Sequence, residues 1–187
     1  CPALTTAHSA LAHARELNHI PSLGVALLHL AVLHQFANQR EPVRQASSVM
    51  LTLAQQYGLP LFESYAEVLL GWCDADMTRL ERALARLKHA GCMLRYSYFS
   101  AFPADIEMQA GHYTAALTRL EQSLQLCGQL GEHWYKPLLL LRLAHCLGKI
   151  PGSDAAQINS HLQQAILLAQ SCGMQRCVEQ ARGMLAG

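Results

Sequence analysis

Histidine and cysteine can bind a metal ion or attack a substrate, and this 187-residue chain contains ten histidines and seven cysteines. Two metal ligands on one helix face need a spacing of three or four residues. The nearest pairs are His29/His34, Cys172/Cys177 and His89/Cys92. The first two pairs are five residues apart, and Gly91 interrupts the third. We therefore expect no metal site, and histidines that are solvated or hydrogen-bonded within the fold.

Other patterns that carry chemistry are missing from the sequence. No cysteine stands in an order that marks it as an activated nucleophile. No glycine-rich loop ends in Lys-Ser or Lys-Thr, and no Gly-x-Ser-x-Gly segment occurs. The sequence therefore predicts a protein that is not an enzyme, with no catalytic residue and no cofactor.

A second group of side chains has the character of binding residues. We predict contacts with a ligand from Tyr65, Trp72, Tyr98, Asp105 and His145. Aromatic side chains suit a binding groove because they combine a large rigid surface with a polar edge. The alternative is that they fill space between helices, which we favour for Trp72. Arg95 and Arg142 could add charge at the rim, although an ordinary solvated arginine is the simpler expectation.

The spacing of small and turn-forming residues indicates what positions these side chains. Five markers recur at intervals of 40, 33, 40 and 42 residues: Asn18, Gly58, Gly91, Gly131 and Gly173. Thirteen residues after each marker stands Ala31, Gly71, Ala104, Ala144 or Ala186. Eight before stands Ala10, Met50, Ala83, Ser123 or Ala165, and seven before stands Leu11, Leu51, Leu84, Leu124 or Ile166. The same internal spacing around each of the five markers predicts a repeat protein, in which one cycle of this pattern corresponds to one structural unit.

Apolar residues recur at helical spacing nearly throughout, and runs of alternating residues are lacking. We predict helices over 3–17, 22–38, 42–57, 61–73, 76–90, 93–109, 113–128, 133–147, 154–171 and 174–185. Each marker fits a helix end that needs a left-handed residue. Pro103 should split its helix near Phe102, and Pro137 requires a helix that begins close to Lys136. The helix after each marker is called A, and the next helix is called B.

These elements predict an all-α fold, a right-handed α-α superhelix. The A and B helices would form a tetratricopeptide-like solenoid of about four and a half antiparallel pairs, continuous over residues 1–187 as a single domain. The 33-residue cycle is close to the standard tetratricopeptide length of 34. The residue eight before the marker is small in four cases of five, and the residue thirteen after it is small in all five, which would allow neighbouring helices to approach closely.

The amino-acid composition of the chain limits the kinds of partner that it could bind. The chain is 51% apolar and 14% charged with a net charge of +1, and it lacks a Lys/Arg cluster, so we expect no nucleic-acid binding. No apolar stretch reaches the ~18 residues that span a bilayer. The odd count of seven cysteines suggests reduced thiols and a cytoplasmic location. Because the chain begins at Cys1 within a helical pattern, we interpret it as a fragment whose exposed end repeats could form a homodimer.

Several segments resemble a known family. They are Ile20-Pro-Ser-Leu-Gly-Val-Ala-Leu-Leu, Leu53-Ala-Gln-Gln-Tyr-Gly-Leu-Pro-Leu, Leu69-Leu-Gly-Trp and Gly131-Glu-His-Trp-Tyr, together with Leu33-His-Gln-Phe-Ala-Asn-Gln-Arg-Glu. This pattern is similar to the C-terminal helical-repeat region of large bacterial regulators, which join a nucleotide-binding ATPase core to a cyclase-like or DNA-binding output domain. The maltose-regulator type of ATPase is a more distant relative. The resemblance covers roughly residues 10–147.

The resemblance implies a regulatory arm of a signalling or transcriptional regulator that docks a protein, a peptide or a small effector. It transfers no catalytic residue, because the chemistry of that family lies in other domains. Lys136 and Pro137 stand where the family usually carries Glu, which changes the polarity of that surface. The alternative is a free-standing scaffold or adaptor that joins protein partners.

Overall fold

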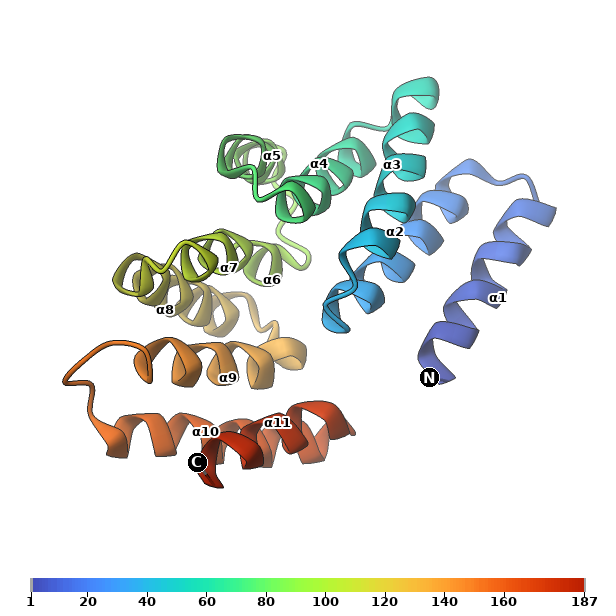
Figure 1. The fold of residues 1–187 in the computed structure, drawn as a ribbon. Helices are drawn as coiled ribbons and strands as arrows, with labels where there is room; N and C mark the ends of the chain where they lie inside the picture. Colours follow the sequence, from blue (N-terminus) through green and yellow to red (C-terminus); the bar gives the residue numbers. More distant parts are fainter. Residues whose placement is uncertain (1, 187) are drawn as a thin grey trace. The chain divides into compact units, whose positions relative to one another are not determined.

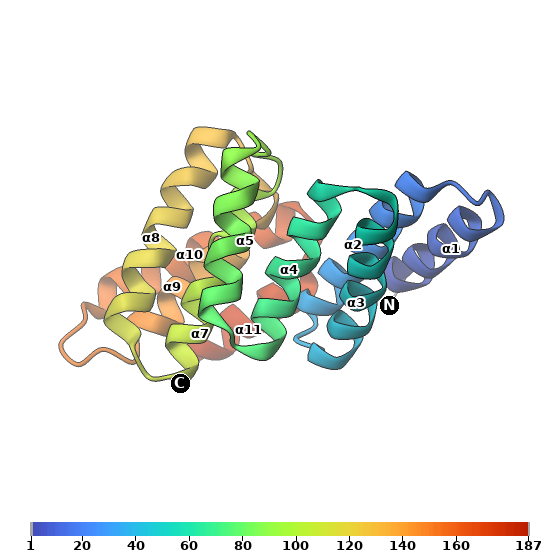
Figure 2. The ribbon, with the colours of Figure 1, turned by 90° about the horizontal axis from the view of Figure 1, so that it is seen from above.

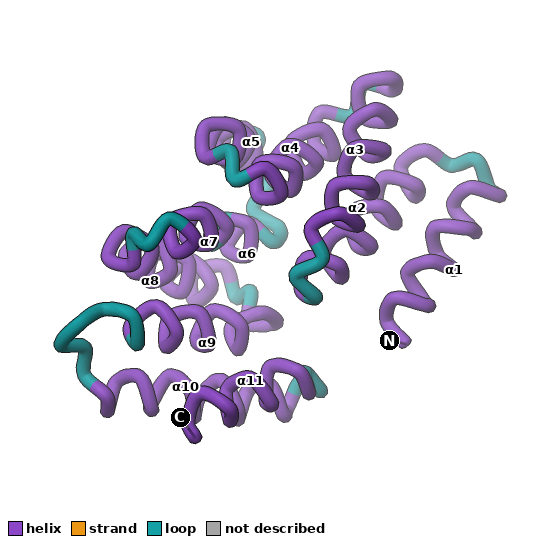
Figure 3. The backbone as a smooth tube through the Cα atoms, viewed as in Figure 1, coloured by secondary structure: helices purple, strands orange, loops and turns teal. Residues whose placement is uncertain are grey.

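The computed structural model describes residues 2–186, and all regular structure in that range is helical (Figures 1 and 3). The helices up to Cys92 are α1 (Pro2–Glu16), α2 (Ile20–Phe36), α3 (Arg40–Tyr57), α4 (Pro60–Asp74) and α5 (Met77–His89). Those beyond it are α6 (Tyr96–Phe99), α7 (Phe102–Gln109), α8 (Tyr113–Leu130), η1 (His133–Tyr135), α9 (Lys136–Leu147), α10 (Ala155–Ser171) and α11 (Gln175–Ala186). The predicted all-α class is confirmed.

The helices form two compact units, one with α1 to α5 and one with α6 to α11. Within each unit, helices that follow one another along the chain pack against each other, as Figure 2 shows for α1 to α4. The A helices are α2, α4, α6 with α7, α9 and α11, and the B helices are α1, α3, α5, α8 and α10. This consecutive packing is the arrangement of an α-α repeat fold. A single continuous domain over 1–187 stays a prediction.

All five markers adopt the left-handed conformation that the sequence predicts. Their φ angles are 49° at Asn18, 64° at Gly58, 68° at Gly91 and Gly131, and 69° at Gly173. After each of the four glycines, the next residue donates its N–H to a carbonyl five residues earlier at 2.8–3.0 Å, as Cys92 does to Leu87 at 3.0 Å. This bond closes a Schellman motif, which satisfies carbonyls at the end of a B helix. The five markers predicted from the sequence therefore lie at the ends of helices in the structure.

A second series of turns joins each A helix to its B helix; the sequence predicts a break at each of these places, but it did not predict the left-handed residue that they share. These turns lie at Asn38, Ala75, Gly111 and Gly152, with φ of 55°, 54°, 79° and 81°. The residue type varies from one turn to the next, so no common marker reveals them. Ala75 is the strained member, because a side chain in the left-handed region costs about 1–2 kcal/mol.

The two prolines that interrupt the helical pattern fall at helix starts. The predicted helix over 93–109 is split into α6 and α7, and Pro103 occupies the first turn of α7. Pro137 occupies the first turn of α9, which begins at Lys136. Proline is tolerated there because the first N–H groups of a helix have no partner within it. Both expectations are confirmed.

The positions eight before and thirteen after the markers are buried in every described helix that carries one, except in α1 and α11. Ala31, Ala104 and Ala144 are fully buried, as are Met50, Ala83 and Ala165, while Ser123 is 1% exposed. Gly71 is also buried, and a Cβ built on it would lie 2.9 Å from the backbone nitrogen of Leu80. The same positions at the two ends, Ala10 and Ala186, are exposed. Close helix approach therefore accounts for the repeat pattern.

Within residues 2–186, every helix is too short or too polar to cross a bilayer. Cys73, Cys127, Cys146 and Cys177 are free and buried, whereas Cys172 is free and exposed. Cys1 lies outside the described residues. The buried thiols serve as small core side chains, as cysteine commonly does.

Candidate functional site

The two predicted site residues of the first unit both lie on α4, and both are buried. Tyr65 is 3% exposed, and its hydroxyl is 3.0 Å from the sulfur of Cys92. Trp72 is 2% exposed, and the guanidinium carbon of Arg40 lies 5.0 Å from its ring centroid, a cation–π arrangement. Both side chains fill space against neighbouring groups of this unit, so their role in binding stays a prediction.

Arg40 and its neighbours form a polar network around the end of α4. Arg40 donates to the carbonyl of Cys73 at 3.0 Å, and the Cys73 thiol donates to the carbonyl of Arg40 at 3.4 Å. Arg44 pairs with Asp74, which Arg79 also contacts at 3.3 Å. Each charge in this network has an opposite charge or a carbonyl beside it. The network therefore ties α3, α4 and the start of α5 together.

The second unit brings Tyr98 and Asp105 into one environment. The carboxylate of Asp105 lies 3.3 Å from Arg142, and their side chains are only 12% and 20% exposed. Arg142 is thus a paired side chain and not the solvated arginine expected from the sequence. Tyr98 is 1% exposed, and burial raises its pKa well above the ordinary value; the nearby charge of Arg142 lowers the pKa by less, and that of Asp105 raises it. The phenol therefore stays protonated and neutral.

Aromatic rings surround Tyr98 on several sides. Its ring centroid lies 4.9 Å from that of Phe102, 5.3 Å from that of Trp134 and 5.3 Å from that of Tyr135. The rings of Phe102 and Tyr135 meet that of Tyr98 edge-to-face and the ring of Trp134 is tilted, and such separations and geometries are typical of favourable aromatic pairs. Trp134 is 37% exposed, so the cluster reaches the surface at that ring.

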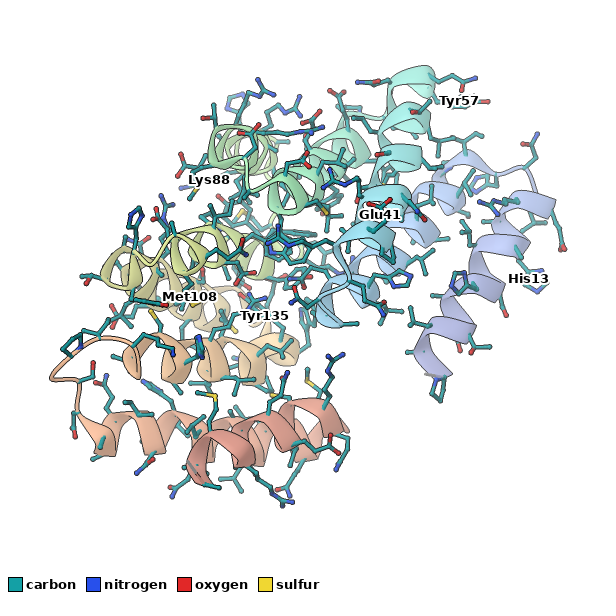
Figure 4. The ribbon with its side chains drawn as sticks, in the orientation of Figure 1. His13, Glu41, Tyr57, Lys88, Met108 and Tyr135 are labelled. Atoms are coloured by element: carbon teal, nitrogen blue, oxygen red, sulfur yellow. The ribbon has the colours of Figure 1, made fainter. Side chains whose placement is uncertain are left out.

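The segment Gly131-Glu-His-Trp-Tyr has a structural role that the sequence did not reveal. The carboxylate of Glu132 accepts N–H groups from Arg95 and Ser97, the second at 3.1 Å, and the Ser97 hydroxyl also donates to it. The hydroxyl of Tyr135, labelled in Figure 4, donates to the Ser97 carbonyl. Glu132 thereby acts as a remote cap for the start of α6, where backbone N–H groups need acceptors. The family-like motif was the available signal for this contact.

His145 is the one predicted site residue with an exposed position. It lies on α9, one helical turn after Arg142, and so shares a helix with the Asp105–Arg142 pair. Partial burial of its ring, with a smaller effect from Lys149, lowers the pKa of His145. The lowered pKa favours the neutral imidazole, which can accept or donate a hydrogen bond from the surface of α9.

A groove between α1 and α2 is an apolar hollow that sequence reasoning missed. It encloses about 500 Å³ and is lined by Ala7, Ala10, His13, Ala14, Leu17, Pro21, Ser22, Val25, Ala26 and His29. His29 lies 2.8 Å from the Val25 carbonyl, and His13 lies 3.1 Å from Glu16. Figure 4 shows His13 on α1. The run of alanines on α1 was the signal that could have revealed a helix face open to close approach.

Metal ligands and reactive thiols are the other groups that could carry chemistry in the described residues. Within 2–186, no three His, Cys, Asp or Glu side chains are arranged to hold a metal ion. Burial raises the pKa of Cys127 and Cys146, and it raises the pKa of Cys73 to about 11. A nucleophilic cysteine needs the opposite shift, because the thiolate is the reactive form. The available features are an apolar groove, a histidine on α9 and an aromatic cluster that reaches the surface.

The chain matches no protein-family model, and no curated protein matches it.

Proposed function

We propose that this chain is a non-catalytic binding module that docks a protein or peptide segment. One observation carries the proposal: the repeat positions from Ala31 to Ala165 are buried between helices, whereas the α1/α2 groove is an apolar hollow whose lining includes exposed aliphatic side chains. Val25 is 46% exposed and Leu17 is 74% exposed there. Open apolar surface of this kind is typical of a site that another molecule covers.

The resemblance to helical-repeat regions of bacterial regulators supports a more specific proposal. In that setting the chain is a regulatory arm of a cytoplasmic signalling or transcriptional regulator. A partner that binds the arm more tightly in one state of the parent protein shifts the equilibrium towards that state. Free thiols at Cys73, Cys127, Cys146 and Cys177 support a reducing compartment.

A peptide library displayed on phage tests the proposed function. Labelled copies of enriched peptides should bind the folded chain in solution, as measured by fluorescence anisotropy. At least one peptide should lose affinity with Val25→Glu in the groove or His145→Ala on α9, since both side chains are exposed. Leu167→Ala is the control, because Leu167 is 67% exposed on α10 and outside both places.

Two results would contradict the proposed binding function. Selection of no peptide beyond those captured by an unrelated helical protein would count against a binding module. Nanomolar binding of ATP or GTP by this chain would also contradict it, because the proposed site holds no phosphate-binding loop.

A further inference from the structure

The connection at the boundary of the two compact units is the longest of those that lead from a B helix to an A helix. The first unit ends at Cys92 and the second begins at Met93. Residues 90–95 separate α5 from α6, whereas the other connections of this kind are 17–19, 58–59, 131–132 and 172–174. Hinges lie in loop residues that can absorb changes of φ and ψ. The connection between α5 and α6 is therefore the place in this chain where a hinge would lie.

The last residue of this connection has a backbone conformation that side chains disfavour. Arg95 has φ of 59° and ψ of 14°, which places it in the left-handed region. A residue other than glycine keeps this conformation only where its surroundings hold it. The helix that follows, α6, has four residues and is too short to be stable through its own hydrogen bonds. The start of the second unit therefore depends on contacts from elsewhere in the chain.

Glu132 supplies such contacts from the loop between α8 and η1. One oxygen of its carboxylate accepts the N–H of Arg95, and the other accepts the N–H of Ser97 at 3.1 Å. The Ser97 hydroxyl donates to the second oxygen, and the Ser97 carbonyl accepts from the hydroxyl of Tyr135 (Figure 4). Ser97 and Tyr135 are fully buried. Because hydrogen bonds to a carboxylate are stronger than those between neutral groups, Glu132 holds the backbone on both sides of Tyr96.

The carboxylate at this position is special to one repeat cycle. Glu132 directly follows its marker, and the residues that directly follow the other markers are His19, Leu59, Cys92 and Met174. The backbone of Glu132 is itself fixed, because its N–H donates to the Cys127 carbonyl at 3.0 Å and its carbonyl accepts from the Cys127 thiol at 2.7 Å. A well-anchored turn thus presents the carboxylate to the longest of the connections.

We propose that Glu132 is a latch that keeps the junction between the two units ordered, and that its release lets residues 93–97 act as a hinge. Glu132 is half-buried, so water can replace its backbone donors when the latch opens. Arg95 then leaves the left-handed region, and the single turn of α6 unwinds while the longer helices keep their packing. This inference concerns a conformational change within the chain and does not require the proposed binding function.

Hydrogen exchange in the isotope-labelled full chain, followed by NMR, tests the latch. Glu132→Ala should raise the exchange rates of the Arg95 and Ser97 amides at least about tenfold, because each loses a hydrogen bond to a charged group. Glu132→Gln should raise them less, since its amide oxygen can still accept, and it decides the test should Glu132→Ala fail to fold. Glu121→Ala is the matched control and should change these rates less than about twofold, because Glu121 is exposed on α8.

Limited proteolysis of the same proteins tests the hinge. Trypsin cleaves after arginine, and it cuts a folded protein where the backbone opens locally. Cleavage between Arg95 and Tyr96 should be at least about tenfold faster in Glu132→Ala than in the wild type. The Glu121→Ala protein should be cut there at the rate of the wild type.

Three results would overturn the inference. Unchanged exchange of the Arg95 and Ser97 amides in both Glu132 variants would show that the carboxylate is not a latch. Faster exchange throughout the helices of both units would show that Glu132 supports the whole fold and not the junction. Faster amide exchange without faster cleavage after Arg95 would show that the junction stays ordered. Because the binding function is tested at Val25 and His145, either proposal can fail while the other stands.

Discussion

Gly71→Ala tests the close approach of α4 and α5 more sharply than any other single substitution. The added methyl carbon would lie 2.9 Å from the backbone nitrogen of Leu80, 3.1 Å from its Cα and 3.0 Å from its Cβ. Two of these three atoms belong to the backbone, so a change of side-chain rotamer cannot relieve the clash. Relief requires α4 and α5 to move apart.

The expected effect is a balance of two terms. Overpacking a well-packed core costs about 1–3 kcal/mol. Alanine is the better helix former, and its propensity returns up to about 1 kcal/mol in the interior of α4. We therefore expect a net loss of about 1–2 kcal/mol in the free energy of unfolding. At roughly 2–4 °C for each kcal/mol in a chain of this size, the melting temperature should fall measurably.

Gly128→Ala makes the same chemical change without the clash and serves as the control. Gly128 lies in α8, and a Cβ built on it meets no heavy atom within 4 Å. Because only the helix propensity changes in this variant, its free energy of unfolding should rise by about 0.5–1 kcal/mol. Urea unfolding followed by circular dichroism measures both variants, and tryptophan fluorescence checks for separate transitions. A Gly71→Ala protein as stable as the wild type would refute the close helix approach.

Three further changes probe the register, the turns and the thiols. Ala165→Leu should lower the free energy of unfolding by about 1–3 kcal/mol through overpacking. Ala10→Leu, at the same repeat position but exposed, should leave the urea midpoint nearly unchanged. Similar midpoints for the two variants would contradict the assignment of these positions to helix contacts. Ala75→Gly should raise the free energy of unfolding by up to about 1 kcal/mol in the same assay, because it removes a left-handed alanine at φ 54°. A loss of stability would show that Ala75 is not strained. Iodoacetamide at pH 8 should alkylate the exposed Cys172 and should not alkylate Cys73 until urea unfolds the chain. Cys73 is protected because burial raises its pKa to about 11. Modification of Cys73 in the native protein, detected by mass spectrometry, would contradict its burial.

The helices and marker turns could be predicted closely because their causes are local. A glycine that adopts a positive φ, or a proline at a first helical turn, acts within a few residues of the chain. The markers from Asn18 to Gly173 accordingly lie at helix ends, and Pro103 splits its helix. The break between α4 and α5 was predicted, but the left-handed conformation of Ala75 was not, because alanine has no intrinsic preference for that region.

The environment of each candidate site residue could not be predicted in the same way. Burial of Tyr65, Trp72 and Tyr98 depends on groups distant in sequence that lie against them, such as Cys92, Arg40 and Tyr135. Helical spacing places a residue on a face, but it does not state how closely the next helix approaches that face.

What the sequence by itself determined is the succession of helices and the positions at which they come closest, because backbone preference and side-chain size are properties of single residues. Only the tertiary structure decided that Arg142 meets Asp105, that Glu132 caps α6 and that the face of α1 around Ala10 stays open. Each of these features depends on distances between residues that are remote along the chain, and such distances are set by the packing of whole helices.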